Sequence, residues 1–372
     1  MRARAVCWAC LVIIGCAASP PAAAHAQQGL SAAADVIFYG DNTEFRNAFS
    51  EGETIFGTAA RGEARIELGN GVRLAAGVFV NQRFGSDSAF ELVRPVLALS
   101  VRGRRSTFIF GTLDTPRAAT PPGPDRAGPH GLLPPIQRER LAFDRPYEAG
   151  LQWLFQGARL EHDLWLHWQR VNTAEHRERL DGGARLQWRL ARALALPLHV
   201  HIVHEGGQLY GAGPVRDSVA VASGIVLSKT AKPDEPAPPA GSDRVARTTG
   251  TLELLALWSH HVPDRQQPQR TRDGAAFFGR AAVEWPAWRA HLLMWRGDDF
   301  LKDEGDPNYQ SVRRDGTRWR GIRDYAETGV TRTFALAAGA ILEASFRYHR
   351  IEDHYEYSYR VLARVRVAGR IR

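Results

Sequence analysis

The segment that decides the fold is ARGEARIELGNGVRLAAGVFVN, residues 60–81. In its first half, small or apolar residues occupy every second position, and the residues between them are Arg, Glu, Arg and Glu. The turn sequence Gly-Asn-Gly follows at 69–71, and alternation resumes after it. Period-two alternation on both sides of an Asn-Gly turn predicts a β-hairpin with one apolar and one mostly polar face.

The same alternation recurs along the chain, in segments of about the nine to thirteen residues that a tilted strand needs to cross a bilayer. We count sixteen segments between residues 35 and 367, with fourteen or eighteen as alternatives. Their connections alternate between short turns and long polar loops. An even strand count with short periplasmic turns and long external loops predicts an all-β fold, a closed antiparallel transmembrane β-barrel. The long segment 228–248, on the side of the short turns, departs from this rule.

The N-terminus has the features of a secretory signal peptide. A basic start, an apolar stretch and an Ala-His-Ala site predict residues 1–26 as the signal, cleaved after Ala26, and residues 27–372 as the barrel. A lipidated Cys16 is the alternative, because Ile-Ile-Gly-Cys resembles a lipobox. All three cysteines lie within the first sixteen residues, which excludes disulfide scaffolds and Cys-ligated metals from the mature chain.

By its architecture the chain resembles the outer-membrane porins of Gram-negative bacteria over residues 30–372. The resemblance implies the outer membrane as location, passive diffusion of small hydrophilic or anionic solutes as function, and outer-membrane lipid and the assembly machinery as partners. Porins typically end on an aromatic residue, whereas this chain ends on Arg372. Two alternatives therefore stay open: an exporter of an acidic polysaccharide, similar to alginate-export barrels, and a plugged barrel with a surface-binding or structural role. Neither the solute nor the oligomeric state can be named, and no motif for nucleic acid is present.

The predicted lumen face is rich in arginine. Such a lining raises the local concentration of anions, although neighbouring acids can cancel the field over a Debye length. We therefore expect an anion preference. The predicted lumen residues are Arg61, Arg65, Arg73, Arg185, Arg189, Arg280, Arg289, Arg347, Arg360, Arg364 and Arg366.

The loop 115–145 contains seven prolines and the apolar cluster Leu-Leu-Pro-Pro-Ile at 132–136. This density of proline forbids a continuous strand or helix. An apolar cluster followed by charges favours a loop folded into the lumen over a flexible external one. The predicted constriction residues are Arg138, Arg140 and Arg145.

The sequence gives weaker support to hypotheses of a catalytic or a metal-binding site. His199 and His201 share one strand face and could offer two imidazoles to a metal, but the sequence shows no third ligand. His162 could serve a hydrolase, yet no Ser or Asp partner is evident. We therefore expect a protein that is not an enzyme, with no metal site and no cofactor.

Overall fold

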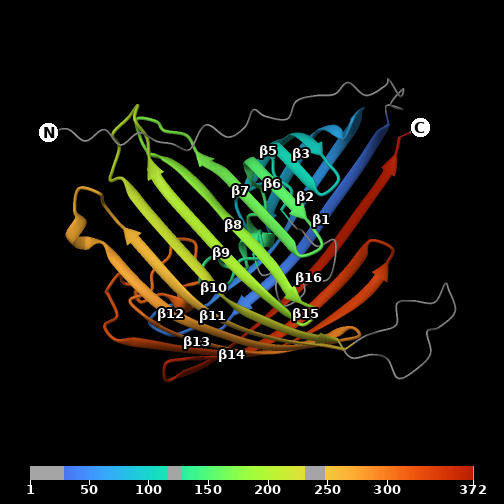
Figure 1. The fold of residues 1–372 in the computed structure, drawn as a ribbon. Helices are drawn as coiled ribbons and strands as arrows, with labels where there is room; N and C mark the ends of the chain where they lie inside the picture. Colours follow the sequence, from blue (N-terminus) through green and yellow to red (C-terminus); the bar gives the residue numbers. More distant parts are fainter. Residues whose placement is uncertain (1–28, 116–127, 231–247, 372) are drawn as a thin grey trace.

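The computed structural model describes residues 29–115, 128–230 and 248–371. Within these ranges the chain forms sixteen strands that close into one antiparallel barrel (Figure 1). Each strand pairs with its neighbours in sequence, and β1 closes the barrel by pairing with β16. The predicted sixteen-stranded barrel is therefore confirmed. The predicted signal peptide and its cleavage site lie outside the described residues.

The strands of the first half are β1 (Leu30–Thr43), β2 (Glu53–Gly69), β3 (Val72–Arg83), β4 (Leu92–Arg102), β5 (Ser106–Thr112), β6 (Ala149–Gln156), β7 (Leu160–Arg170) and β8 (Glu178–Ala191). Those of the second half are β9 (Leu194–Gly206), β10 (Arg216–Thr230), β11 (Thr249–Val262), β12 (Arg272–Trp285), β13 (Trp288–Asp298), β14 (Ile322–Ala337), β15 (Ala340–Ile351) and β16 (His354–Arg370). The helical elements are α1 (Leu141–Asp144), η1 (Pro268–Arg270) and η2 (Pro307–Tyr309). In the described ranges no helix is both long and apolar enough to span a membrane.

The hairpin between β2 and β3 forms as the sequence predicts. Asn70 and Gly71 both have positive φ, at 51° and 76°. A tight hairpin turn of this kind needs positive φ at both central residues, because that backbone twist matches the twist of the flanking strands. Asn and Gly are the residues that adopt it at least cost.

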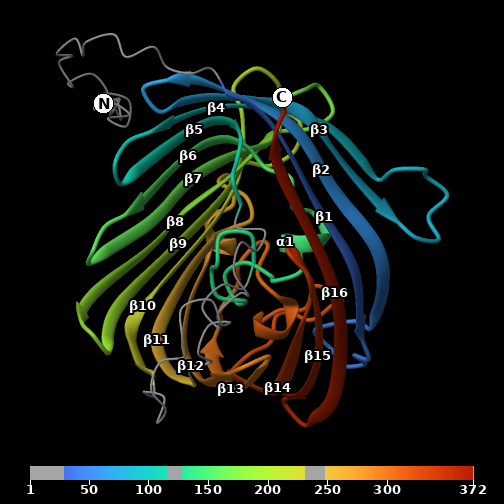
Figure 2. The same ribbon diagram turned by 90° about the vertical axis from the view of Figure 1, so that its right-hand side faces the viewer.

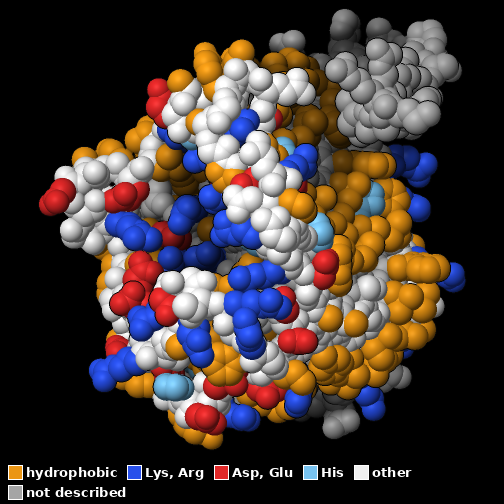
Figure 3. All heavy atoms as spheres, turned by 90° about the vertical axis from the view of Figure 1, so that its left-hand side faces the viewer, with side chains coloured by type: hydrophobic (Ala, Val, Ile, Leu, Met, Phe, Trp, Pro, Cys, Tyr) orange, Lys and Arg blue, Asp and Glu red, His pale blue; other side chains and the backbone are white. Residues whose placement is uncertain are grey.

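Strand β16 shows how alternation separates the two faces of the wall. Tyr355 is 64% exposed and Val361 is 45% exposed on the outer face, whereas Glu356 and Ser358 are each 7% exposed on the inner face. Figure 3 shows the resulting hydrophobic outer surface on one side of the view and charged side chains around the hollowed region. An apolar exterior with polar residues inside is the pattern that a lipid-embedded barrel requires.

The two ends of the barrel differ in their connections. The start of β1, the end of β16 and the short turns after β2, β4, β6, β8, β12 and β14 lie at one end, which we call the turn end. The opposite end, the loop end, carries the β5–β6 and β13–β14 connections and also the tight β15–β16 turn. In outer-membrane barrels the long loops face outward. The connection 231–247 lies outside the described residues.

The interior is filled by parts of two connections. Figure 2 shows α1 and segments of the β13–β14 connection inside the ring of strands. Leu132, Leu133 and Ile136 of the β5–β6 connection are buried in one cluster with Phe300 and Tyr309 of the β13–β14 connection. Wall residues of β7 and β10 to β15, with Phe49 of the β1–β2 connection and Leu113 directly after β5, complete this cluster. Apolar packing thus holds both connections against the inner wall.

Candidate active site in the barrel interior

A cavity of about 430 Å³ is lined by the two inward-folded connections, the β1–β2 connection and the strands β1, β2, β14, β15 and β16. This volume is in the range of about 300–1,000 Å³ that is usual for small-molecule sites. Its lining includes Tyr325, Glu327, His349 and Ser358 of the wall and Glu139 of the β5–β6 connection. Hydroxyl, imidazole and carboxylate groups therefore meet around one cavity.

Strand register brings three of these wall residues together. Glu327 on β14 stands directly opposite His349 on β15. Across the next pair, His349 stands opposite Glu356 of β16, and Ser358 follows two residues later on the same face. All three side chains are nearly buried: Glu327 is 6%, His349 is 3% and Ser358 is 7% exposed.

The three side chains are linked by short contacts. His349 Nε2 lies 2.8 Å from Ser358 Oγ, and His349 Nδ1 lies 2.8 Å from the Tyr325 hydroxyl. That hydroxyl donates to Glu327 Oε2 at 2.7 Å, and the same carboxylate oxygen lies 3.4 Å from His349 Nδ1. Because the Tyr325 hydroxyl donates its proton to Glu327, it accepts a hydrogen bond from the Nδ1–H of His349. The Nε2 of His349 is then unprotonated and can accept the proton of Ser358.

The arrangement resembles that of serine hydrolases, in which a hydroxyl nucleophile, an imidazole base and an acid act together. It differs in that the Tyr325 hydroxyl lies between the imidazole and the acid. Glu327 is held by two further groups, because His291 Nε2 lies 2.7 Å and Arg347 Nη1 3.6 Å from its Oε1. Arg347 also stands opposite Ser358 in the register of β15 and β16. Positive charge is thus placed beside the strand position where an oxyanion would form.

Charged side chains of the two inward-folded connections also line the cavity. The Glu139 carboxylate lies 2.6 Å from Arg347 and 3.4 Å from Arg360. Burial alone would raise the pKa of Glu139, but these two guanidinium groups outweigh it and lower the pKa to about 2. Asp306 of the β13–β14 connection behaves in the opposite way, because burial raises its pKa to about 6. Among the carboxylates that line the cavity, Glu139 is therefore firmly ionised, whereas Asp306 titrates at about pH 6.

The predicted lumen arginines line the inner wall in pairs with acids rather than as free charges. Arg289 donates to Thr331 Oγ1 at 3.4 Å. The other ten each contact a carboxylate, at Glu63, Glu67, Glu161, Glu253, Glu139, Glu343 or Asp35. Their anion-attracting role remains a prediction, and the pairing limits how far each charge acts.

Of the predicted constriction residues, Arg138 and Arg140 line the cavity. Arg145, at the end of α1, is exposed and is not among the described residues of its lining. Arg140 contacts Glu53 of β2, while Arg138 is partly buried, which lowers its pKa. Their role as constriction residues of a pore stays a prediction.

His130 anchors the β5–β6 connection to the wall. Its Nε2 lies 2.6 Å from Glu148 and its Nδ1 lies 2.8 Å from Asp163. Its ring stacks on Trp165 at 3.7 Å between centroids. Burial lowers the pKa of His130, but the two carboxylates outweigh this and raise the pKa to about 10. A buried imidazolium between two carboxylates therefore fixes the connection in place.

Sequence reasoning missed Tyr325, Glu327, His349 and Ser358 as a group. The available signal was that these polar residues occupy inward positions on three consecutive strands, but their alignment depends on register. The histidine that it weighed for a hydrolase, His162, packs against the rings of Trp153 and Phe155. Its Nδ1 has no hydrogen-bond partner in the described part of the chain.

Solved structures show the same fold. A loop-deletion variant of the outer-membrane protein OmpT of Vibrio cholerae is 10% identical with a TM-score of 0.52, and the match covers 91% of this chain and 99% of that one. Refolded OmpT of Vibrio cholerae in a trimer form is 9% identical with a TM-score of 0.51, at the same coverage. These matches define the class of fold: the chain has the fold of porin-like outer-membrane β-barrels.

The family follows from a second comparison. The chain belongs to the Lipid A 3'-O-deacylase-type family, whose model matches residues 22–369. No curated protein matches the chain significantly. Family membership corrects the sequence-based expectation that the protein is not an enzyme, because a deacylase family points to an enzyme. The expectation failed because catalytic groups assembled across strands leave no local motif.

Proposed function

We propose that the protein is an outer-membrane hydrolase that cleaves an acyl ester, with Ser358 as the nucleophile. The observation that carries the proposal is the 2.8 Å contact between Ser358 Oγ and His349 Nε2, with Nδ1 of the same ring held by Tyr325 and Glu327. A serine hydroxyl is a weak nucleophile until an adjacent base takes its proton, and this geometry supplies that base.

The reaction would follow the two-step course of acyl transfer. Ser358 Oγ attacks the ester carbonyl carbon while its proton passes to His349 Nε2. The tetrahedral intermediate collapses, the carbon–oxygen bond to the alcohol breaks, and His349 returns the proton to that alcohol. Water then attacks the acyl-serine, its proton passes to His349 and on to Ser358, and a carboxylic acid is released. Glu327 and Tyr325 would stabilise the imidazolium formed in each step.

For the substrate, we propose an acylated lipid with anionic groups, namely lipid A, which the family description names. Arginine is the residue best suited to bind phosphate, because its planar guanidinium donates two parallel hydrogen bonds. The cavity lining includes Arg138, Arg140, Arg314 and Arg360. His349 is two residues from the end of β15, next to the tight turn of the loop end. The site is thus close to the end that faces outward in such barrels.

The test is hydrolysis by the purified, folded protein of p-nitrophenyl butyrate and, separately, of lipid A analysed by mass spectrometry. We expect Ser358→Ala to reduce ester hydrolysis at least about a thousandfold, as loss of a triad nucleophile does. Ser345→Ala is the matched control, because Ser345 lines the same cavity on β15. Equal activity of the wild type and Ser358→Ala would remove Ser358 as the nucleophile. Activity on the short ester without release of acyl chain from lipid A would overturn the substrate alone.

A second candidate function is an anion-preferring channel, favoured by the same arginine-lined cavity within a porin-like barrel. Paired acids such as Glu139 neutralise part of that charge. Single-channel recording in a salt gradient tests this function independently of the hydrolase. A reversal potential that favours chloride, weakened in Arg138→Glu with Arg140→Glu, would support it. Absence of conductance would contradict it.

A further inference from the structure

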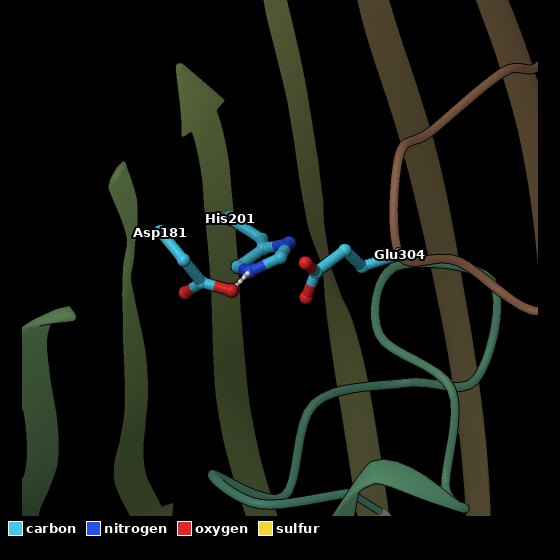
Figure 4. A group of neighbouring side chains, drawn as sticks. All are labelled: Asp181, His201 and Glu304. Carbon is cyan, nitrogen blue, oxygen red and sulfur yellow. Dashed lines mark ion pairs between the residues drawn. The ribbon is translucent and has the colours of Figure 1, made fainter. Parts of the chain in front are cut away.

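A second cluster of ligating side chains lies on the far side of the interior from Ser358's strand. Asp181 on β8, His201 on β9 and Glu304 in the β13–β14 connection place one potential ligand atom each within 4.8 Å of the others. Figure 4 shows the three side chains converging on one point, two from the wall and one from the connection. The role described for Ser358 does not use any of them.

The burial and hydrogen bonding of the His201 side chain indicate that it binds a ligand. Its side chain is 0% exposed. Among the described residues its Nδ1 has no hydrogen-bond partner, and its Nε2 has only an ion-pair contact with Asp181 that does not meet hydrogen-bond geometry. A buried imidazole without hydrogen bonds is costly, and such groups are rare. Its Nε2 does lie 3.2 Å from Asp181 Oδ2. Two ligands bound at about 2.0–2.2 Å to one zinc ion lie roughly 3–4 Å apart, so this spacing suits a shared cation.

The surrounding groups orient the two carboxylates. Trp165 Nε1 donates to Asp181 Oδ1 at 3.1 Å, which leaves Oδ2 directed toward His201. Gln169 Nε2 donates to Asp181 Oδ2 at 3.3 Å and to Glu304 Oε1 at 3.0 Å, so one amide holds both acids. Partners that hold ligating carboxylates in position are typical of metal sites.

Two basic side chains near the cluster limit what it binds. Arg179 contacts Glu304 Oε1 at 3.1 Å, and Lys302 Nζ donates to the Asp303 carbonyl at 2.7 Å. The net negative charge that the cluster offers to a cation is therefore modest. The cluster also offers too few oxygens for calcium, which takes six to eight. One nitrogen and two carboxylates instead suit a transition metal such as zinc.

The geometry points to a divalent transition-metal site formed by Asp181, His201 and Glu304, which ties the β13–β14 connection to the barrel wall. Glu304 is separated from His201 by 103 positions in sequence, so a metal here would join two distant parts of the chain. The same connection carries Asp306, Asn308 and Tyr309 into the lining of the cavity that contains Ser358. The metal would thus hold one wall of that cavity.

The test measures zinc bound by the full chain, folded in detergent without a histidine tag, stripped with a chelator and dialysed against zinc. We expect one zinc ion per chain more in the wild type than in His201→Ala. His199→Ala is the matched control, since His199 is buried on the same face two residues away, and should retain the ion. Equal zinc content in wild type and His201→Ala would overturn the site and leave His201 in contact with Asp181 alone.

Cobalt provides a second readout. Cobalt bound in the wild type should give visible absorption of a four- or five-coordinate ion, and Asp181→Asn should lose it. If His201→Ala does not fold, as judged by heat-dependent mobility on gels, Glu304→Gln takes its place, because Glu304 lies outside the strands. Glu304→Gln should lose the ion while the barrel stays intact. Retention of the full zinc content and spectrum by Glu304→Gln would contradict the proposed ligand set.

Discussion

Tyr325→Phe probes how the acid of the candidate active site acts on His349. The Tyr325 hydroxyl lies 2.8 Å from His349 Nδ1 and donates to Glu327 at 2.7 Å, whereas the direct distance from Nδ1 to Glu327 is 3.4 Å. The hydroxyl is therefore the shorter link between the imidazole and the carboxylate. Phenylalanine removes that link and keeps the ring that packs edge-on against Tyr309.

The expected loss follows from the hydrogen bonds removed. A hydrogen bond to a charged group contributes about 1.5–3 kcal/mol. Glu327 already lies close enough to approach Nδ1 directly, so we take the lower part of that range. A loss of about 1.5–2 kcal/mol in the transition state corresponds to roughly 10–30-fold in kcat. KM should change little, because the hydroxyl acts on His349 and not on the substrate.

The assay is steady-state hydrolysis of a short-chain ester by the folded protein in detergent. Tyr309→Phe is the matched control, because Tyr309 lines the same cavity and is buried beside Tyr325. The control should keep its kcat within about twofold, given that it leaves every contact of His349 in place. An unchanged kcat in Tyr325→Phe would refute the relay and mean that Glu327 orients His349 by itself.

Three further predictions concern stability, each measured by unfolding in detergent. His130→Leu leaves Glu148 and Asp163 without their shared cation and should cost about 3–5 kcal/mol. The pKa of His130 is about 10 in the folded protein and about 6.5 in the unfolded chain. The stability that protonated His130 contributes should therefore be complete below pH 6.5 and disappear as the pH rises through 10. A cost of His130→Leu that does not depend on pH would contradict this. Asp306→Asn should stabilise the protein above pH 6 but not at pH 4, because burial raises the pKa of Asp306 to about 6 and its charged form is disfavoured; an equal effect at both pH values would argue against it. Val361→Arg, on the lipid face of β16, should cost about 2–4 kcal/mol near the midplane, whereas an unchanged stability would place this face in water.

The fold could be predicted from sequence because alternation is a local signal. Each strand shows which residues share a face, and the outer and inner residues of β16 lie as that alternation requires. The Asn70-Gly71 turn is equally local, since it depends on backbone preference at two positions. Connection lengths then distinguished the two ends of the barrel.

The candidate active site could not be predicted in the same way, because it depends on register between strands. A shift of one residue between β14 and β15 would separate Glu327 from His349. The cluster of Asp181, His201 and Glu304 depends in addition on the path of the β13–β14 connection inside the barrel. Sequence reasoning placed His199 and His201 on one face but could not supply the ligands that other segments contribute.

The most direct test of Ser358 as the nucleophile is reaction of the folded protein with a fluorophosphonate. In such a reaction an activated serine oxygen bonds to phosphorus and fluoride leaves, and no knowledge of the natural substrate is needed. We expect one adduct per chain, located by peptide mass spectrometry on Ser358, and its loss in both Ser358→Ala and His349→Gln but not in Ser345→Ala. Absence of an adduct on Ser358 in the folded wild type, or labelling that persists in His349→Gln, would contradict an activated serine at this site.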